Sequence, residues 1–234
     1  TRLPGGRDGV AVVNSLEQGQ VLLIGGRTSN GPTHEVLRFS VRDERLDTME
    51  ARLPVKVHSA GAVLVDRSIY TFGGRTYQSK LVDAVCRIDL DTGEIKQQPK
   101  GLPVARAEVA AAPAADGRIW LIGGVDEHGP VDGIMAFDPG TGLTNHLTLR
   151  LPQAVTGASV IRWKGDWLIA GGRTRKGPRD RVDILAPDGT ATRSPHRLPW
   201  PVAHAASARM KDRVFIAGGV SDQRIEARVI RFPR

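Results

Sequence analysis

The chain has 234 residues, a hydrophobic content of 40% and a formal net charge of +8. No apolar run approaches the roughly 20 residues of a membrane-spanning helix, so we expect no insertion into a membrane. Cys86 is the only cysteine, which excludes an internal disulfide and a thiolate metal cluster but does not identify the cellular compartment.

Five pairs of adjacent glycines recur at almost constant spacing. Successive pairs start 48, 50, 48 and 47 residues apart, at Gly25-Gly26, Gly73-Gly74, Gly123-Gly124, Gly171-Gly172 and Gly218-Gly219. Each pair closes a short apolar run such as Ile119-Trp120-Leu121-Ile122. A strand-rich repeat of about 50 residues is typical of propeller blades.

The second unit shows how one repeat divides into strands. Leu53-Pro54 opens a loop, residues 60–65 form a small apolar first strand, and residues 66–68 make a tight turn. The second strand runs into Gly73-Gly74, and a polar loop follows. Residues 82–90 and 94–98 are predicted to form a third and a fourth strand.

The composition of each strand predicts its place in a blade. The second strand is apolar at nearly every position, which indicates that both of its faces are covered by neighbouring blades. The small residues of the first strand suit crowding around a central channel, and the polar fourth strand suits the outer rim. Glycine pairs fit a strand end that needs a positive φ or a close approach to a neighbour. Cys86, beside Val85 in the third strand, is expected to be a buried core thiol.

Each unit thus has Leu-Pro, a small first strand, an apolar second strand that runs into Gly-Gly, and a third strand that ends in a turn such as residues 138–142. This order resembles the Kelch repeat over essentially the whole chain. The resemblance implies an all-β, Kelch-type β-propeller with five four-stranded blades in a single domain. The blades would span approximately residues 1–50, 51–100, 101–149, 150–198 and 199–234. The repeats are degenerate, because Leu46, Ile95 and Leu143 stand where the family usually has an aromatic residue.

The two ends of the chain give a further expectation. The sequence stops where the fourth strand of the last blade would start, so we expect either a three-stranded last blade or a ring that lacks residues upstream of Thr1. Because the chain begins at Thr1 rather than at Met, we expect a mature form, a fragment or a trimmed chain.

Candidate site residues lie on two sets of loops that form the ligand-facing end of Kelch-like propellers. Directly after a di-glycine stand Arg27, Arg75 and Arg173. An alignment of the loops before the first strands on Pro4, Pro54, Pro103, Pro152 and Pro201 adds Arg7, His58, Arg106 and His204, with Arg7, Arg106 and His204 at equivalent positions. Ring symmetry would gather these side chains into a cationic mouth that suits a carboxylate, a phosphate or an acidic peptide. The competing interpretation is structural, with each arginine paired to a nearby carboxylate or loop carbonyl.

Three functions are compatible with this pattern. We favour a non-enzymatic recognition module that binds an acidic protein segment or an anionic small ligand. The alternative is a carbohydrate-active propeller resembling bacterial N-acetylneuraminate epimerases (mutarotases), in which arginines would hold the sugar carboxylate and Glu108 or His204 would transfer protons. The third is a structural domain of a larger protein, with a mouth filled by inter-blade salt bridges.

The sequence predicts neither a metal site nor a cofactor. The histidines lack His-x-His and His-x3-His spacing. A phosphate-binding Gly-x4-Gly-Lys loop and a Gly-x-Ser-x-Gly elbow are both absent from the sequence. The net charge permits nucleic-acid binding, but this function has weak support because aromatic residues are not interleaved with the basic ones.

Overall fold

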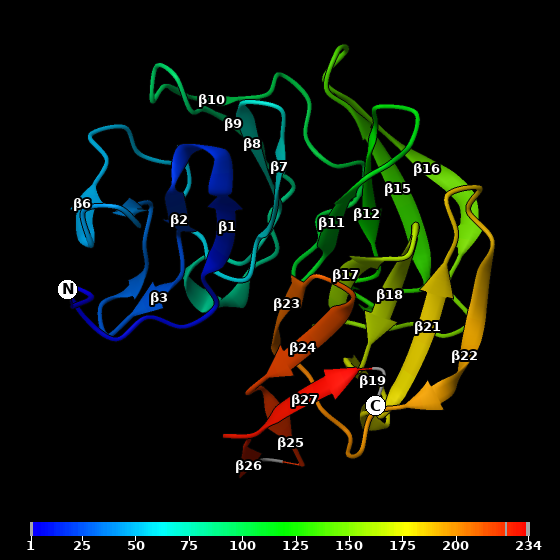
Figure 1. The fold of residues 1–234 in the computed structure, drawn as a ribbon. Helices are drawn as coiled ribbons and strands as arrows, with labels where there is room; N and C mark the ends of the chain where they lie inside the picture. The colour runs from blue at the N-terminus through cyan, green and yellow to red at the C-terminus, as the bar shows by residue number, and fades with distance from the viewer. Residues whose placement is uncertain (1, 223, 233–234) are drawn as a thin grey trace. The chain divides into compact units, whose positions relative to one another are not determined.

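The computed structural model describes residues 2–222 and 224–232, and strands dominate these residues (Figure 1). Two short 3-10 turns, η1 (Leu16–Gln18) and η2 (Tyr77–Ser79), interrupt them. None of the helical segments in the described part of the chain is long and apolar enough to cross a membrane.

Five antiparallel sheets follow one another along the chain, and we number them as blades 1 to 5. The first two are built from β1 (Ala11–Ser15), β2 (Gln20–Ile24), β5 (Val36–Ser40) and β6 (Arg45–Thr48), and from β7 (Gly61–Val65), β8 (Ser68–Phe72), β9 (Val85–Asp89) and β10 (Ile95–Gln97). Blade 3 contains β11 (Ala110–Pro113), β12 (Ile119–Ile122), β15 (Gly133–Asp138) and β16 (Leu143–Arg150). Blade 4 contains β17 (Ser159–Trp163), β18 (Asp166–Ala170), β21 (Arg181–Leu185) and β22 (Ala191–Arg197), and blade 5 contains β23 (Ala206–Met210), β24 (Arg213–Ala217) and β27 (Val229–Phe232).

In four blades a small two-stranded hairpin follows the di-glycine. These hairpins pair β3 (Arg27–Thr28) with β4 (Gly31–Pro32), β13 (Val125–Asp126) with β14 (Gly129–Pro130), β19 (Arg173–Thr174) with β20 (Gly177–Pro178), and β25 (Val220–Ser221) with β26 (Arg224–Ile225). In blade 2 the turn η2 takes this place.

This arrangement confirms the predicted all-β, five-bladed propeller, and the last blade has three strands within the described residues. The chain divides into two compact units. The first comprises residues 1–108 and 139–144 and holds blades 1 and 2; the second comprises residues 109–138 and 145–234 and holds most of blade 3 with blades 4 and 5. The assignment of the whole chain to a single domain with the blade limits given above stays a prediction.

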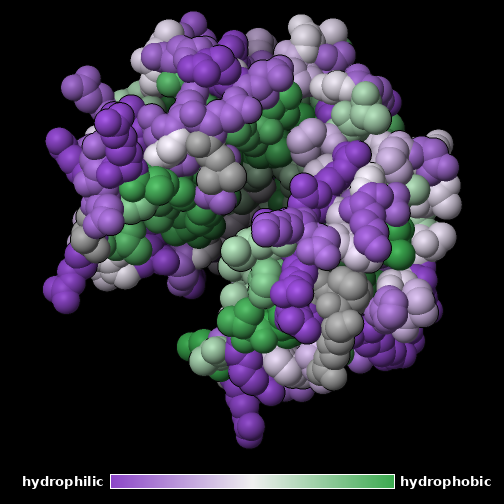
Figure 2. Space-filling model, in the orientation of Figure 1, coloured by the Kyte–Doolittle hydropathy of each residue, from purple (hydrophilic) through white to green (hydrophobic). Residues whose placement is uncertain are grey.

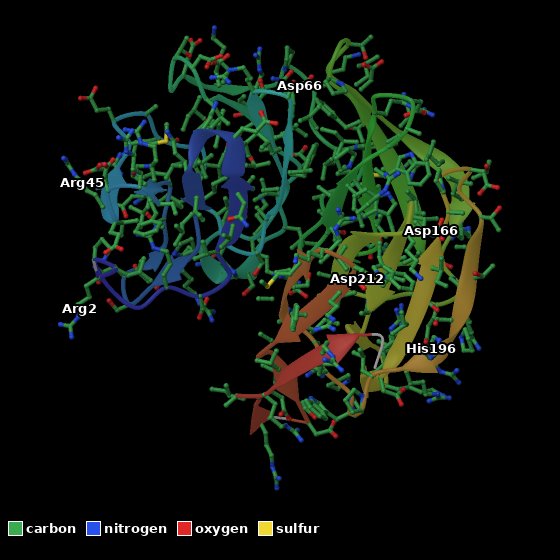
Figure 3. All side chains as sticks on the ribbon, in the orientation of Figure 1. Arg2, Arg45, Asp66, Asp166, His196 and Asp212 are labelled. Carbon is green, nitrogen blue, oxygen red and sulfur yellow. The ribbon has the colours of Figure 1, made fainter. Side chains whose placement is uncertain are left out.

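The strands have the burial that their composition predicts. Every residue of β8 and of β12 is buried. The fourth strands β6, β10, β16 and β22 are mostly exposed, and Figure 3 labels Arg45 on β6 and His196 on β22 among their polar side chains. First strands of consecutive blades lie side by side, β1 with β7 in the first unit, and β11 with β17 and β17 with β23 in the second. Among the second strands, β8 and β12 are thus covered on both faces, whereas β2 and β24 are only partly buried.

Apolar side chains fill the space between consecutive blades within each unit. One core cluster joins blades 1 and 2 and includes Leu22, Ile24, Ile69 and Cys86. Two others join blade 3 to blade 4 and blade 4 to blade 5. Cys86 is 5% exposed, which confirms the prediction of a buried thiol.

The opposite face of blade 1 carries an apolar groove of about 490 Å³. Its lining includes Val21, Leu23 and Phe39, and Figure 2 shows hydrophobic surface over this blade. The equivalent face of blade 2, which includes Ile69 and Ile88, is buried against blade 1. Both faces of blade 1 therefore carry apolar side chains, as both faces of blade 2 do.

The di-glycine joins each blade to the next. The second glycine donates its N–H to a carbonyl of the following blade, at 2.8 Å from Gly26 to Val57 and 2.9 Å from Gly124 to Val155. The first glycine has φ near +60° in both pairs, and a Cβ on it would lie 2.5 Å from the Val57 oxygen at Gly25 and 2.6 Å from the Val155 oxygen at Gly123. Only glycine fits a position that needs both a left-handed backbone and this approach.

Gly25→Ala is expected to destabilise the protein by about 2 kcal/mol more than Gly19→Ala. Both glycines belong to blade 1 and have φ of +60°, but nothing lies within 4 Å of a Cβ on Gly19. The control therefore isolates the displacement of the Val57 carbonyl from the cost of the left-handed backbone. Urea denaturation of the two variants measures the difference, and equal losses would contradict the role assigned to the di-glycine.

Cys86 is expected to resist thiol reagents in the folded protein. Burial raises the pKa of its thiol to about 11, against a smaller lowering by a hydrogen bond with Thr71. Reaction with Ellman's reagent at pH 8 should therefore be slow in buffer and fast in guanidinium chloride. Because Cys86 lies in the cluster between blades 1 and 2, rapid labelling of the folded protein would show that these blades separate readily.

Candidate functional site

Each blade presents two loops at one end, the loop before its first strand and the loop after its di-glycine. Isolated backbone bridges join them, from Asp8 to Arg27 in blade 1, from His58 to Arg75 in blade 2 and from Thr156 to Arg173 in blade 4. The hairpins between first and second strands, where Figure 3 labels Asp66, Asp166 and Asp212, lie at the opposite end. The three arginines that follow a di-glycine thus lie beside the loops with which the sequence analysis grouped them.

One residue before every first strand has a left-handed backbone. It is two positions ahead of the strand in all five blades, with φ between 54° and 58°, at Gly9, Ser59, Glu108, Gly157 and His204. Backbone hydrogen bonds link these residues from blade to blade, at 2.7 Å from Ser59 to Gly9, 2.8 Å from Glu108 to Ser59 and 2.8 Å from His204 to Gly157. A φ near +60° is costly for the three residues of this series that are not glycine, Ser59, Glu108 and His204, so the hydrogen bonds and the packing of the blades must hold them in this conformation.

This series corrects the alignment of His204 with Arg7 and Arg106. His204 occupies the position of Glu108, two residues beyond that of Arg106. The position of Arg106 is taken in blade 5 by Val202, since the carbonyls of both accept the N–H of a di-glycine. Pro199, which follows the buried Leu198, is the counterpart of Pro54 and Pro103, so an alignment on Pro201 displaces His204 by two residues.

In the first unit a group of ionisable side chains surrounds His58. His58 is 8% exposed, and its Nδ1 lies 3.0 Å from the Ser59 hydroxyl. Burial lowers the pKa of His58; Arg27 and Arg75 lower it further, whereas Asp8 and Glu108 oppose them. We call these five side chains (Asp8, Arg27, His58, Arg75 and Glu108) the His58 cluster. It combines three of the predicted binding residues with the predicted alternative acid–base residue Glu108.

The two arginines of the His58 cluster differ in their partners. Arg27 donates to both carboxylate oxygens of Asp8, at 3.2 and 2.9 Å, and both side chains are more than half exposed. Arg75 donates from one nitrogen to the carbonyl of Ser79 at 3.0 Å, and it forms no ion pair with a carboxylate in the described residues. Arg75 is therefore the arginine of the cluster that is not ion-paired within the described residues.

Arg7 and Arg106 are more deeply placed. The Arg7 side chain is 4% exposed, forms a 2.6 Å ion pair with Glu35 and donates to the Gly25 carbonyl at 3.2 Å. Arg106 is 3% exposed, and its carbonyl accepts the N–H of Gly74 at 2.9 Å. Both residues thus have structural contacts, and ligand binding by either stays a prediction.

Arg173 and His204 belong to the second unit. Arg173 is partly exposed and is in no ion pair with a described carboxylate. His204 is exposed, and its ring lies where a side chain on Gly157 would stand, with ring atoms 2.5 Å from an added Cβ. The small residue at Gly157 therefore leaves the space that the imidazole occupies. Ligand binding by these two residues also stays a prediction.

Sequence reasoning missed a buried ion pair in blade 4. Arg179 and Asp183 are 7% and 1% exposed, and Arg179 donates to Asp183 at 2.7 Å and to the Gly171 carbonyl at 2.6 Å. A usable signal was present, because Arg179 and Asp183 are four residues apart beside a di-glycine. The carbonyls of Gly25 and Gly171 thus each accept a buried guanidinium, which favours a structural role for Arg7 as well.

The His58 cluster does not have the composition of a metal centre. Within residues 2–222 and 224–232 there is no group of three or more His, Cys, Asp or Glu side chains that could hold a metal ion. Its arginines instead suit hydrogen bonding to carboxylate or phosphate oxygens.

Comparison with known proteins identifies the family. The model of the KLHDC2/KLHL20/DRC7 Kelch-repeats domain matches residues 6–219, and the chain belongs to this family. Kelch propellers generally serve as protein-interaction modules, so this is the class of function that the fold defines.

Individual relatives share part of the chain. Kelch-like protein 38 of Rattus norvegicus is 29% identical over 115 residues, and that of Mus musculus is 30% identical over 115 residues. Each match covers 48% of this chain and 20% of the relative, so most of the relatives' length has no counterpart here. Among solved structures, the structure of YjhT matches with a TM-score of 0.80 at 15% identity, covering 94% of this chain and 75% of that one, and this likeness concerns the fold alone.

His58 is expected to make the folded protein less stable in mild acid. Because its pKa is lowered in the folded state, the unfolded chain binds a proton first, and stability present above about pH 6.5 is lost as the pH falls toward the folded pKa. The free energy of unfolding should therefore fall between pH 7 and pH 5 more steeply for the wild type than for His58→Gln. Urea denaturation at several pH values measures both slopes, and parallel profiles would contradict the buried state of His58.

Proposed function

We propose that this chain is a Kelch-type recognition module whose cationic loops bind an acidic segment of a partner protein. The observation that carries the proposal is the backbone pairing that brings the loops of Arg27 and Arg75, from two adjacent blades, to the loop of the buried His58. Arg75 exchanges backbone hydrogen bonds with His58 itself. Arg27 exchanges them with Asp8, beside Gly9, whose carbonyl accepts the N–H of Ser59. Both arginines follow a di-glycine, so the rigid junction between blades positions them. Arg173 and His204, at the corresponding ends of blades 4 and 5, are proposed as ligand contacts of the second unit considered by itself.

The arginine contacts allow a carboxylate to enter the His58 cluster. The Arg27–Asp8 pair is exposed on both sides, and such pairs contribute only about 0–1 kcal/mol, so an incoming carboxylate can compete with Asp8. Arg75 uses one donor on the Ser79 carbonyl, and a guanidinium has five. A bound carboxylate would therefore gain charge-assisted hydrogen bonds without breaking a strong contact.

His58 links this binding to protonation. A carboxylate held by Arg27 or Arg75 would place negative charge near the imidazole and raise its pKa toward the ordinary value. By reciprocity, protonation of His58 would strengthen binding of the carboxylate. Asp8 and Glu108 act on His58 in the same direction as the ligand, so they limit the size of this effect.

Octaglutamate is expected to bind the wild-type protein saturably in isothermal titration calorimetry, and Arg75→Ala should weaken this binding about tenfold, which corresponds to about 1.4 kcal/mol. Arg67→Ala is the matched control. It removes the same charge from the same blade, but Arg67 pairs with Asp91 at the opposite end. Affinity should also be higher at pH 6 than at pH 8, and His58→Gln should abolish that difference.

Other outcomes separate the remaining functions. Equal weakening by Arg75→Ala and Arg67→Ala would mean that only net charge matters, and it would contradict a localised site. Saturable binding of N-acetylneuraminate but not of octaglutamate would favour the carbohydrate-active alternative. Binding of neither would favour a structural role for the arginines.

A further inference from the structure

The loop after the di-glycine of blade 2 departs from the repeat. Where the other four blades form a two-stranded hairpin, blade 2 forms the turn η2, in which Gln78 and Ser79 have φ of 67° and 61°. Hydrogen bonds hold this conformation, from Arg75 to the Ser79 carbonyl at 3.0 Å and from the N–H of Thr76 to the Lys80 carbonyl at 2.9 Å. The result is a fixed loop that leaves the Tyr77 side chain 72% exposed.

The Tyr77 ring lies against the hairpin of the preceding blade. A Cβ added to Gly31, in β4 of blade 1, would lie 3.0 and 3.2 Å from the Cδ2 and Cε2 atoms of the ring. Gly31 has φ of +96°, so both its backbone and the ring above it favour glycine. An aromatic ring that is seated on backbone yet mostly exposed offers its other face to a ligand.

Two adjoining cavities lie beside this ring within the first unit. One of about 340 Å³ is lined by Asn30, Pro32, Val55, Lys56, Thr76 and Tyr77. The other, of about 610 Å³, continues along the β3–β4 hairpin to the N-terminal loop at Pro4–Arg7. They share Asn30, Pro32 and Lys56, and we call the combined surface the Lys56 groove.

The uncompensated charge of the Lys56 groove is positive. Its carboxylate, Glu35, has two cationic partners, Arg7 at 2.6 Å and Arg52 at 3.4 Å. The hydrogen bond from Arg7 lowers the pKa of Glu35, so that this side chain stays ionised and engaged. Lys56 is exposed and is in no ion pair with a carboxylate in the described part of the chain.

We propose that the Lys56 groove binds an extended, proline-containing segment of a partner protein, with a glutamate or aspartate of that segment on Lys56 and a proline against Tyr77 and Pro32. This inference rests on the proposed recognition function and specifies a second contact of the same partner. Aromatic-lined grooves suit polyproline II segments, whose conformation is fixed before binding. Lys56 lies where the apolar cavity beside Tyr77 meets the more polar cavity along the β3–β4 hairpin. Its positive charge therefore favours a peptide with an acidic residue next to the proline. η2 and the β3–β4 hairpin both follow a di-glycine, so the groove opens at the end of the blades that carries the His58 cluster.

The probe is a fluorescein-labelled heptapeptide, Gly-Pro-Pro-Glu-Pro-Pro-Gly, titrated with the whole chain and followed by fluorescence anisotropy. We expect saturable binding that weakens at least tenfold in Lys56→Glu and at least fivefold in Tyr77→Ser, whereas Tyr77→Phe keeps it within twofold. Replacing the glutamate of the probe with glutamine should weaken binding to the wild type, and Lys56→Gln should bind both probes equally. Lys100→Glu is the matched control, because Lys100 is exposed and outside the linings of both cavities.

Three results would overturn the inference: no saturable binding to the wild type, equal losses in Lys56→Glu and Lys100→Glu, or unchanged binding in Tyr77→Ser. Melting temperatures of the variants within a few degrees of the wild type confirm that a loss of binding is not a loss of folding. Titrating Arg75→Ala with octaglutamate, and the Lys56 and Tyr77 variants with the heptapeptide, separates the two proposals. If Arg75→Ala loses octaglutamate binding but substitutions at Lys56 and Tyr77 leave heptapeptide binding unchanged, the proposed function is retained and the groove is rejected. If Arg75→Ala keeps octaglutamate binding but substitutions at Lys56 and Tyr77 weaken heptapeptide binding, the groove is retained and the His58 cluster is rejected.

Discussion

The junction between consecutive blades depends on one backbone hydrogen bond, which in four glycine pairs runs from the second glycine to a carbonyl in the loop that precedes the next blade. This bond is 2.8 to 2.9 Å long at Gly26, Gly74, Gly124 and Gly172. It requires the first glycine to turn left-handed directly beneath the accepting carbonyl, where a Cβ has no room. The apolar second strands can stack only because this turn ends them without pushing the next blade away.

The same junction determines where the candidate site lies. In blades 1, 2, 4 and 5 the residue after the pair bridges to the loop before the first strand, which places Arg27 beside Asp8 and Arg75 beside His58. The accepting carbonyls belong to Val57 and Arg106 in the first unit, so Arg106 supports the fold through its backbone whatever its side chain contacts. Substitutions at Arg75 therefore report on binding more directly than substitutions at Arg106, because the Arg75 guanidinium lies outside this junction.

The sequence was sufficient to predict the blades, because the di-glycine is both a conformational requirement and a visible pattern. The sequence was insufficient to predict the role of a side chain whose partner is distant along the chain, as in the pairing of Arg7 with Glu35, 28 positions away. Two patterns were readable but missed. Leu53, Leu102 and Leu198 mark the true loop register through their burial, and a Gly-Pro dipeptide recurs six residues after three di-glycines, at Gly31, Gly129 and Gly177. The second pattern marks three of the four small hairpins. Blades 2 and 5 both lack it, and of these two only blade 2 forms a turn in place of the hairpin, where it carries Tyr77.

Net charge overstates the positive charge that these loops offer to a partner. Arg7 and Arg179 are buried in ion pairs, and Arg27 shares its charge with Asp8. Because ion pairing is local, the cations that can distinguish a partner are those that the chain leaves without a carboxylate, and in the described part of the first unit these include Arg75 and Lys56. Both belong to blade 2: Lys56 lies in the loop before its first strand, and Arg75 lies at the start of the irregular loop that carries Tyr77. Recognition by this protein is therefore expected to depend on how a few uncompensated charges are spaced around an exposed aromatic ring, rather than on the overall charge of +8.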